Sequence, residues 1–404
     1  MTSTSELAAP GARTEAPARW FGTGHGDTGD IGTAGSQAAS AATAGREASL
    51  VVLFTSFDEG FDRLLASVRE VVGPGVPILG CTTCGEITGE DVSEGGVMAV
   101  ALGGPGFSAT IAGAGQPSGG QRDAGGAIAR ALPRSGRPHE VLMILADGMV
   151  GSQHELLRGV YSTVGARVPL VGACAGSLNF RDAHHFYDDG SGPRILHGGA
   201  VAALIGSDGP LGVGVAHGWR PGGEPMNLTE VADSWIQTID HQPALDVYLG
   251  RLGVDDSVAF DPGAFFVFAH AHPLGISRRG GEDIRVVNLA DLRSRSMTVA
   301  SDVQQGAVAW LMETDPDALT TGGADSCGQA LAGLGDVAPL GVLSFDCSAR
   351  KLQLGPDGVR REIAGMRALT GAAPLVGFYS MGEIARTRGM RGMHHMTSVT
   401  LAFG

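Results

Sequence analysis

Two cysteines with a suggestive spacing follow directly on a short apolar segment. Cys81 and Cys84 form a Cys-x-x-Cys pair, a spacing that suits a redox pair or half of a zinc site. A closed zinc site needs about four ligands, and the sequence holds no second Cys-x-x-Cys to supply them. The alternative is that the two thiols pack as small apolar groups beside a glycine-rich turn.

Cys347 and Arg350 follow a second apolar segment, which ends at Phe345. Ligands of open α/β sheets usually bind at such strand ends. Arg350 could hold a carboxylate through two parallel hydrogen bonds and lower the pKa of the Cys347 thiol. It could equally tie two loops together. A cysteine nucleophile also needs a histidine and an orienting group beside it, so a cysteine-dependent enzyme is a further alternative and not the main hypothesis.

Glu86 and Glu383 occupy the same place in two copies of one sequence pattern. Each copy begins with a Pro, two aliphatic residues and a Gly, and a Gly-Glu-Ile sequence starts five residues after that first Gly. The two copies run over 77–87 and 374–384. A third copy, at 169–176, starts alike but reaches its second Gly one residue sooner. Paired carboxylates on equivalent loops could bind an amino group or act as acid and base, or they could accept backbone N–H bonds and hold the loops in shape.

The elements that position these residues form a repeat of strand, helix, strand, long loop and strand. Apolar runs predict the strands and an apolar face at helical spacing predicts each helix. The predicted strands are 50–54, 76–80 and 96–102 in the first unit, 141–145, 168–172 and 199–205 in the second, and 342–345, 374–378 and 398–403 in the third. The helices run over 61–72, 157–164 and 363–369, and an alanine-rich helix over 31–47 precedes the first unit.

This repeat predicts an α/β fold with mixed sheets in two domains. A crossover helix between two strands favours a parallel pair, and we expect the last strand of each unit to pair antiparallel. A different region separates the second and third units, with strands over 211–216, 265–269 and 284–288 and a helix over 244–252. We therefore predict a disordered tail over 1–19, a first domain over 20–240 and a second over 241–404.

Composition limits the classes of function. The chain has 404 residues, 43% of them hydrophobic, and a formal net charge of −14. It has no run of basic residues for a nucleic-acid partner, no apolar run of 18 residues to span a membrane and no apolar core of a signal peptide. The odd number of cysteines, five, argues against a disulfide framework. We expect a cytoplasmic protein.

Two groups of histidines remain. His217, Trp219 and Arg220 form a compact group that could line a pocket for a small anionic ligand or fill the seam between the two domains. His394 and His395 precede the last predicted strand, and either could ligate haem iron or hydrogen-bond a ligand.

Taken together, these stretches resemble the FIST family, a pair of domains (FIST-N and FIST-C) found in signal-transduction proteins. The resemblance rests on 78–87, 217–221, 345–350, 377–384 and 394–397, in the family's order; His395 departs from it, because the family often has Asn there. The resemblance implies a sensory module for small ligands, with amino acids suggested, and some members look like haem proteins that sense nitric oxide. A separate signalling protein, such as a histidine kinase or a cyclic-nucleotide enzyme, would be the partner.

The sequence therefore leads to one main hypothesis, a cytoplasmic sensory protein that binds an amino acid or a similar metabolite without a cofactor. The predicted ligand-binding residues are Cys81, Glu86, His217, Trp219, Arg220, Cys347, Arg350, Tyr379, Glu383 and His394. The alternative is a nitric-oxide sensor in which His394, His395 or His217 ligates haem.

Overall fold

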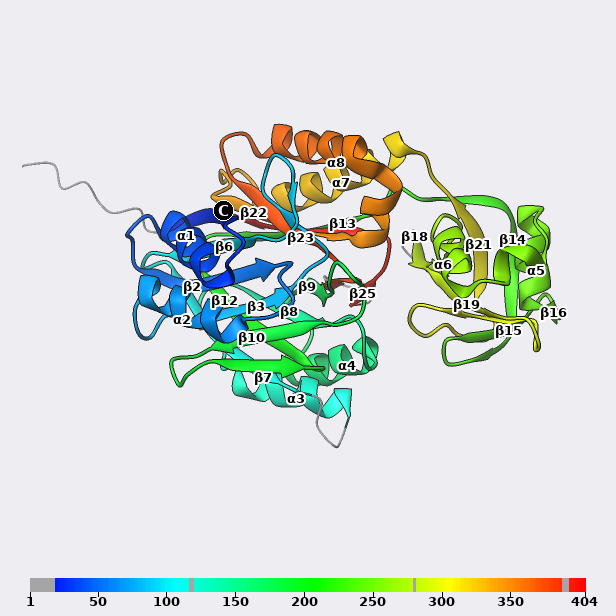
Figure 1. The fold of residues 1–404 in the computed structure, drawn as a ribbon, viewed down its shortest axis with the longest axis horizontal. Coiled ribbons are helices and arrows are strands. Elements are labelled where there is room, and N and C mark those ends of the chain that lie inside the picture. The colour runs from blue at the N-terminus through cyan, green and yellow to red at the C-terminus, as the bar shows by residue number, and fades with distance from the viewer. Residues whose placement is uncertain (1–18, 116–119, 279–280, 387–391) are drawn as a thin grey trace, which may run out of the picture.

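The computed structural model describes residues 19–115, 120–278, 281–386 and 392–404. Its larger part is a body of three α/β layers with paired helices on the outside, and a smaller lobe lies beside the body (Figure 1). The predicted tail over 1–19 lies outside the described residues except for Arg19, whose guanidinium donates to the backbone oxygen of Gly404.

The first layer contains the first predicted unit, preceded by one more strand and helix. The elements are β1 (Trp20–Gly26), α1 (Ile31–Thr43), β2 (Ala48–Thr55), α2 (Phe61–Val72), β3 (Ile78–Thr82) and β6 (Val97–Gly103). Its strands lie in the order β1-β6-β2-β3. The β2–β3 pair is parallel and β6 runs antiparallel to β2, as the crossover argument predicts.

The other two layers repeat this plan. The second has β7 (Phe107–Ala114), α3 (Gln121–Ala131), β8 (His139–Asp147), α4 (Gln153–Val164), β9 (Leu170–Ala175) and β12 (Ala200–Ser207). The third has β13 (Leu211–Ala216), α7 (Pro316–Ala332), β22 (Gly341–Cys347), α8 (Ser348–Thr370, kinked at Gly355), β23 (Leu375–Ser380) and β26 (Ser398–Phe403). The strand orders, β7-β12-β8-β9 and β13-β26-β22-β23, match the first layer. The three-unit α/β prediction is confirmed.

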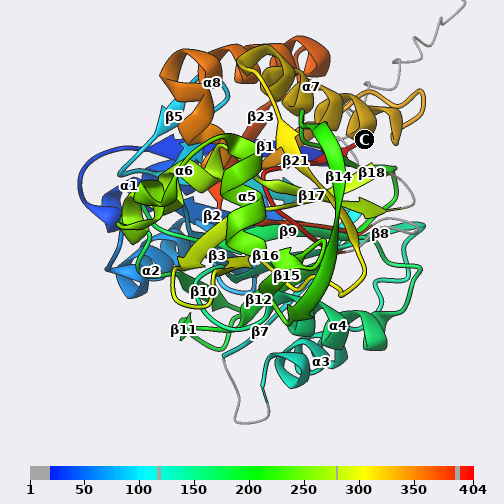
Figure 2. The same cartoon turned by 90° about the vertical axis from the view of Figure 1, so that its right-hand side faces the viewer.

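Each unit donates a two-stranded hairpin to a neighbouring sheet, so the three layers are closed into a ring. The hairpins are β4 (Glu86–Ile87) with β5 (Val92–Ser93), β10 (His184–Asp188) with β11 (Arg194–His197), and β24 (Glu383–Arg386) with β25 (Met393–His394). They extend the third, first and second sheets beyond β23, β3 and β9 respectively. Figure 2 shows the three helix pairs arranged around this ring behind the lobe.

The apolar strands are uninterrupted because both of their faces are buried. In β2, Leu50, Val52 and Phe54 point into a core that all three sheets share, whereas Val51 and Leu53 pack under α1 and α2. The Gly of each Pro-x-x-Gly copy lies so close to the neighbouring parallel strand that a Cβ would overlap a backbone carbonyl oxygen. These contacts are Gly80 to Leu53, Gly172 to Ile144 and Gly377 to Ser344.

The lobe occupies the segment between β13 and α7. Its strands are β14 (Arg220–Ala232), β15 (Trp235–Ile239), β16 (Gln242–Pro243), β17 (Leu274–Arg278), β18 (Gly281–Arg285), β19 (Val287–Asp291), β20 (Ser296–Val299) and β21 (Val308–Glu313). Its helices are α5 (Ala244–Leu252), the short 3₁₀ helix Asp256–Ala259 and α6 (Pro262–His270). The predicted boundary after residue 240 falls inside this lobe.

Two predicted elements differ from the structure. The predicted strand 284–288 covers the end of β18 and the start of β19, which are separated at Val286 and pair with β17 and β20 respectively. The segment 265–269, predicted as a strand, belongs to helix α6. Asp261 caps this helix by accepting the N–H of Ala264, and Pro262 stands at its first position, both of which are helix-start signals. A short apolar run does not distinguish a strand from a buried helix. Among the described residues, no helix is long and apolar enough to cross a membrane.

Candidate functional site

A cavity of about 360 Å³ lies where the lobe meets the body. The body contributes the loop after β8 and the start of α4, the junction of β22 with α8, and two single residues. These body residues are Gly148, Met149, Gly151–His154, Cys347–Ala349, Met381 and His395. The lobe contributes Ser234, Phe266, His270, Val286, Asn288 and Val299–Asp302. Parts of the chain that are far apart in sequence therefore share one polar cavity.

The loop that leads into α4 is held in place by its own side chains. Asp147, at the end of β8, accepts the N–H groups of Met149 and Val150 at 2.7 and 2.9 Å. The hydroxyl of Ser152 caps the helix by accepting the N–H of Glu155 at 3.3 Å. Helix α4 therefore begins at the cavity, with the positive end of its dipole there.

His395 and Ser301 meet at the cavity from opposite sides. The Nε2 atom of His395, in the body, lies 2.7 Å from the Oγ atom of Ser301, in the lobe. Burial, followed by the nearby charge of Arg285, lowers the pKa of His395 well below its usual value. The imidazole is therefore neutral at pH 7. A second contact joins the two parts, because Nε2 of Gln353 donates to the backbone oxygen of His270 at 2.5 Å.

Cys347 is the predicted ligand-binding residue that lines this cavity; the other predicted residues, all of which the structure describes, lie elsewhere. Its side chain is buried. Burial, with a smaller contribution from the charge of Glu383, raises the pKa of the Cys347 thiol well above its usual value. The group at the cavity wall is a neutral thiol.

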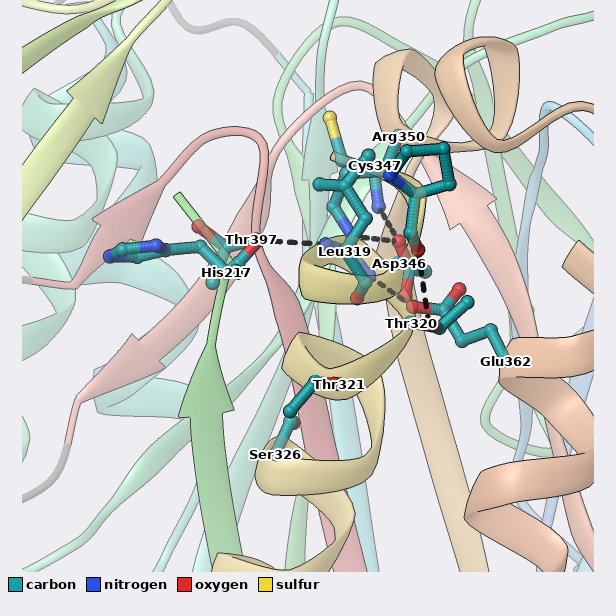
Figure 3. A network of polar contacts seen from close by, with 12 residues as sticks. His217, Leu319, Thr320, Thr321, Ser326, Asp346, Cys347, Arg350, Glu362 and Thr397 are labelled. Atoms are coloured by element: carbon teal, nitrogen blue, oxygen red, sulfur yellow. Dashed lines mark hydrogen bonds and ion pairs between the residues drawn. The ribbon is translucent and has the colours of Figure 1, made fainter. Parts of the chain in front are cut away.

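Arg350 is the centre of a buried network within the third layer (Figure 3). Its guanidinium pairs with the carboxylates of Asp346, at 2.8 Å, and Glu362. It also donates to the backbone oxygens of His217, at 2.8 Å, and Leu319, at 3.1 Å. The side chain is fully buried, so its donors hold β22, α7, α8 and the segment leading to the lobe together.

Glu86 and Glu383 are equivalent in structure as well as in sequence. In each case the residue three positions before the glutamate donates a hydrogen bond from its hydroxyl to the carboxyl group. Thr83 donates to Glu86 at 2.5 Å, and Ser380 donates to Glu383 at 2.9 Å. Glu86 also accepts from Ser56. Both side chains are fully buried. Burial raises the pKa of Glu86 to about 8 and that of Glu383 well above its usual value. Both carboxyls are therefore largely protonated at neutral pH.

The remaining predicted residues are distributed over the core and the surface. Cys81 and Tyr379 are fully buried, and within the described residues no group hydrogen-bonds to the Tyr379 hydroxyl. Trp219 is also buried. Arg220 lies on the surface, where it pairs with Asp315 at 3.2 Å. The group at 217–220 therefore does not act as one cluster.

Each of the three histidines considered for haem has a hydrogen-bond contact at one ring nitrogen. Nδ1 of His217 accepts the N–H of Trp219 at 3.0 Å, and Nε2 of His394 lies 3.0 Å from the backbone oxygen of Ala385. Of the three, His395 lines the cavity, but its Nε2 is bonded to Ser301. Within the part of the chain that the structure describes, no group of three or more His, Cys, Asp or Glu side chains could hold a metal ion.

Sequence reasoning missed most of the cavity. Ser301, Asn288 and Asp302 come from the lobe, which belongs to no repeat, and His154 lies in the first turn of α4. A helix N-terminus after a strand was the one signal that could have pointed to His154. The sequence offers no signal for Ser301.

Comparison with known proteins defines the class of the molecule. The FIST N domain model matches residues 49–242 and the FIST C domain model matches 244–386. The chain belongs to the FIST family. FIST domains are generally sensory domains of signal transduction, and the two matches fit a two-domain α/β architecture.

The relatives that the comparisons find add no function. Two uncharacterized proteins of Mycobacterium tuberculosis, from strains CDC 1551 / Oshkosh and ATCC 25618 / H37Rv, are each 24% identical over 89% of this chain and 92% of their own length. The solved structure of PurLQS from Thermotoga maritima aligns with 95% of this chain and 72% of its own, at 10% identity and a TM-score of 0.20. A likeness that weak carries no argument.

Proposed function

We propose that the cavity between body and lobe binds an amino acid or a similar small metabolite, and that this binding is the sensory event. The observation that carries the proposal is that residues of both parts line one cavity of about 360 Å³. That volume is near the small end of ligand pockets. A ligand that touches both parts favours the arrangement in which it makes contacts with both, and so shifts the population towards it.

The lining suits a molecule that carries both charges. The positive end of α4 and the imidazole of His154 lie on the cavity wall, and they favour a carboxylate. Asp302, also on the wall, is an acceptor for an ammonium group. In this proposal these residues, and not Glu86, Glu383 or Arg350, receive the ligand, because the latter three are buried in internal hydrogen bonds.

We further propose that the signal passes, in the cytoplasm, to a separate protein such as a histidine kinase or a cyclic-nucleotide enzyme. A change in the angle between lobe and body is the kind of movement that such a partner could detect.

A thermal-shift screen of the full chain against the common amino acids and small organic acids tests the proposal. We expect at least one ligand to raise the melting temperature, because binding to the folded state alone stabilises it. Ala300→Leu fills the cavity and should abolish that shift. Ala66→Leu, the same change at an exposed position of α2, should leave it intact. The absence of any stabilising ligand, or equal binding by Ala300→Leu, would contradict the proposal.

A further inference from the structure

Ser301 and His395 have the arrangement of an activated nucleophile and its base. Their Oγ and Nε2 atoms lie 2.7 Å apart, within the 2.6–3.2 Å range in which a base takes a proton from a nucleophile. Both residues line the same cavity. His395 is buried, whereas Ser301 is half-buried, so its hydroxyl is open to a molecule in the cavity.

The backbone at this contact is strained on both sides. Ser301 has φ = 66°, and Met396, the residue after His395, has φ = 55°. Non-glycine residues seldom adopt this left-handed region, and those that do are concentrated at functional sites. A nucleophile that must project into a cavity commonly sits on such a turn.

The surroundings suit an attack on a carbonyl group. Nε2 of His395 has a lone pair when the ring proton is on Nδ1, and in that tautomer it accepts the hydroxyl proton of Ser301 across the 2.7 Å contact. Asn288 lines the same cavity and carries an amide N–H₂ group, a donor of the kind that stabilises an oxyanion. The positive end of α4 adds a favourable potential for the same negative charge.

We propose that Ser301 and His395 form a catalytic dyad that hydrolyses small carboxylic esters in this cavity. The inference deepens the proposed function and rests on it for the cavity as the place where a small ligand lies. Oγ of Ser301 attacks the ester carbonyl carbon while its proton passes to Nε2 of His395. The bond to the alkoxy group breaks, and that oxygen takes the proton from His395, which leaves an acyl-serine and an alcohol.

Water completes the reaction. A water molecule gives a proton to Nε2 of His395 and attacks the acyl carbon; Oγ of Ser301 leaves and recovers the proton. The ester and one water yield a carboxylic acid and an alcohol, and no oxidant or reductant is needed. The product acid belongs to the same chemical class as the carboxylate ligand proposed above, so the cavity would bind what it produces.

An alkyl fluorophosphonate tests the dyad directly, since a serine activated by a base displaces its fluoride and retains the phosphonyl group. We expect the intact mass of the full chain to show one adduct, which peptide mapping places on Ser301. Ser301→Ala should show none, whereas Ser294→Ala, at an exposed serine of the same lobe, should label like the parent. In His395→Gln, labelling should be at least about a hundredfold slower, the low end for loss of a general base.

Hydrolysis of p-nitrophenyl acetate provides the second readout and should fall to background in Ser301→Ala. A folded parent chain whose Ser301 stays unlabelled, or an esterase rate that Ser301→Ala does not change, would overturn the dyad. The ligand screen separates the two proposals. If a ligand stabilises both the parent and Ser301→Ala while no adduct forms, the dyad is wrong and the sensory cavity stands. If the adduct forms and no amino acid or organic acid stabilises the chain, the sensory proposal is the one that fails.

Discussion

Replacing the buried, ionisable Glu86 by Gln should make the protein more stable at neutral pH. Glu86 is fully buried and accepts hydrogen bonds from Thr83 and Ser56. Burial raises its pKa from 4.5 to about 8. Because its nearest partners are hydroxyls and not cations, the folded protein holds Glu86 as a neutral acid, and Gln is the uncharged residue of the same shape.

The magnitude follows from linkage between protonation and folding. The folded pKa lies above the unfolded one, so the stability from Glu86 is complete below about pH 4.5 and is lost as pH rises to about 8. The two pKa values differ by about 3.5, and each pKa unit corresponds to about 1.36 kcal/mol, so the total loss is about 5 kcal/mol. At pH 7 the loss is about 3 kcal/mol. The Gln side chain of Glu86→Gln does not titrate, so this variant does not lose that stability as the pH rises.

Urea unfolding of both proteins at several pH values measures the effect. The free energy of unfolding of Glu86→Gln minus that of the parent should be near zero at pH 4.5 and should rise to about 3 kcal/mol at pH 7. A difference that stays constant between pH 4.5 and pH 8 would refute the reasoning, because it would mean that Glu86 ionises alike in both states.

Glu140→Gln is the matched control, because the pKa of Glu140 is shifted in the opposite direction and its effect on stability should have the opposite sign. Burial alone would raise the pKa of Glu140, but hydrogen bonds from Ser135 and Arg134 outweigh it and lower the pKa. Its stabilisation is therefore present above the unfolded pKa and lost as pH falls through the folded one. We expect Glu140→Gln to be less stable than the parent at pH 7 and to approach it in acid.

Three further predictions concern the interior. Arg350→Met leaves the buried carboxylates of Asp346 and Glu362 without their cation and should cost about 3–5 kcal/mol in urea unfolding; a loss below about 1 kcal/mol would contradict the network. Gly377→Ala should abolish soluble expression because its Cβ would overlap the Ser344 carbonyl, whereas Gly365→Ala, in open space, should express normally. All five cysteines are buried, so Ellman's reagent should detect them only after denaturation, and a fast-reacting native thiol would revive the cysteine-enzyme alternative.

The repeat made much of the body predictable. The Pro-x-x-Gly copies mark β3, β9 and β23, because the closely packed parallel strand behind each leaves room for Gly alone. The hydrophobic period marks the helices that cover them. The exchange of hairpins between layers was not predictable, since β4 pairs with β23 almost three hundred residues later and no local pattern encodes such a pairing.

The lobe was harder to predict because it has no repeat to compare with. Its apolar run 265–269 was predicted as a strand, and the capping role of Asp261, with Pro262 behind it, was the overlooked signal for helix α6. The helix 244–252 was predicted correctly as α5, since an apolar face recurs there at helical spacing.

Residue type was a poor guide to which residues line the cavity. Arg350 and Glu86 looked like ligand contacts because charged residues after strands often are, yet the structure uses them within the protein. Ser301 looked ordinary because its left-handed backbone and its contact with His395 exist only in the folded chain. Cys347 was selected for its position after a strand, and that argument did lead to the cavity.

Hydrogen–deuterium exchange, with and without a ligand that stabilises the protein, tests the central claim most directly. The claim is that the ligand lies between body and lobe. We predict slower exchange in both cavity walls together, at 148–154 in the body and 299–302 in the lobe. Slower exchange confined to the loops that carry Glu86 and Glu383, with both cavity walls unchanged, would contradict it.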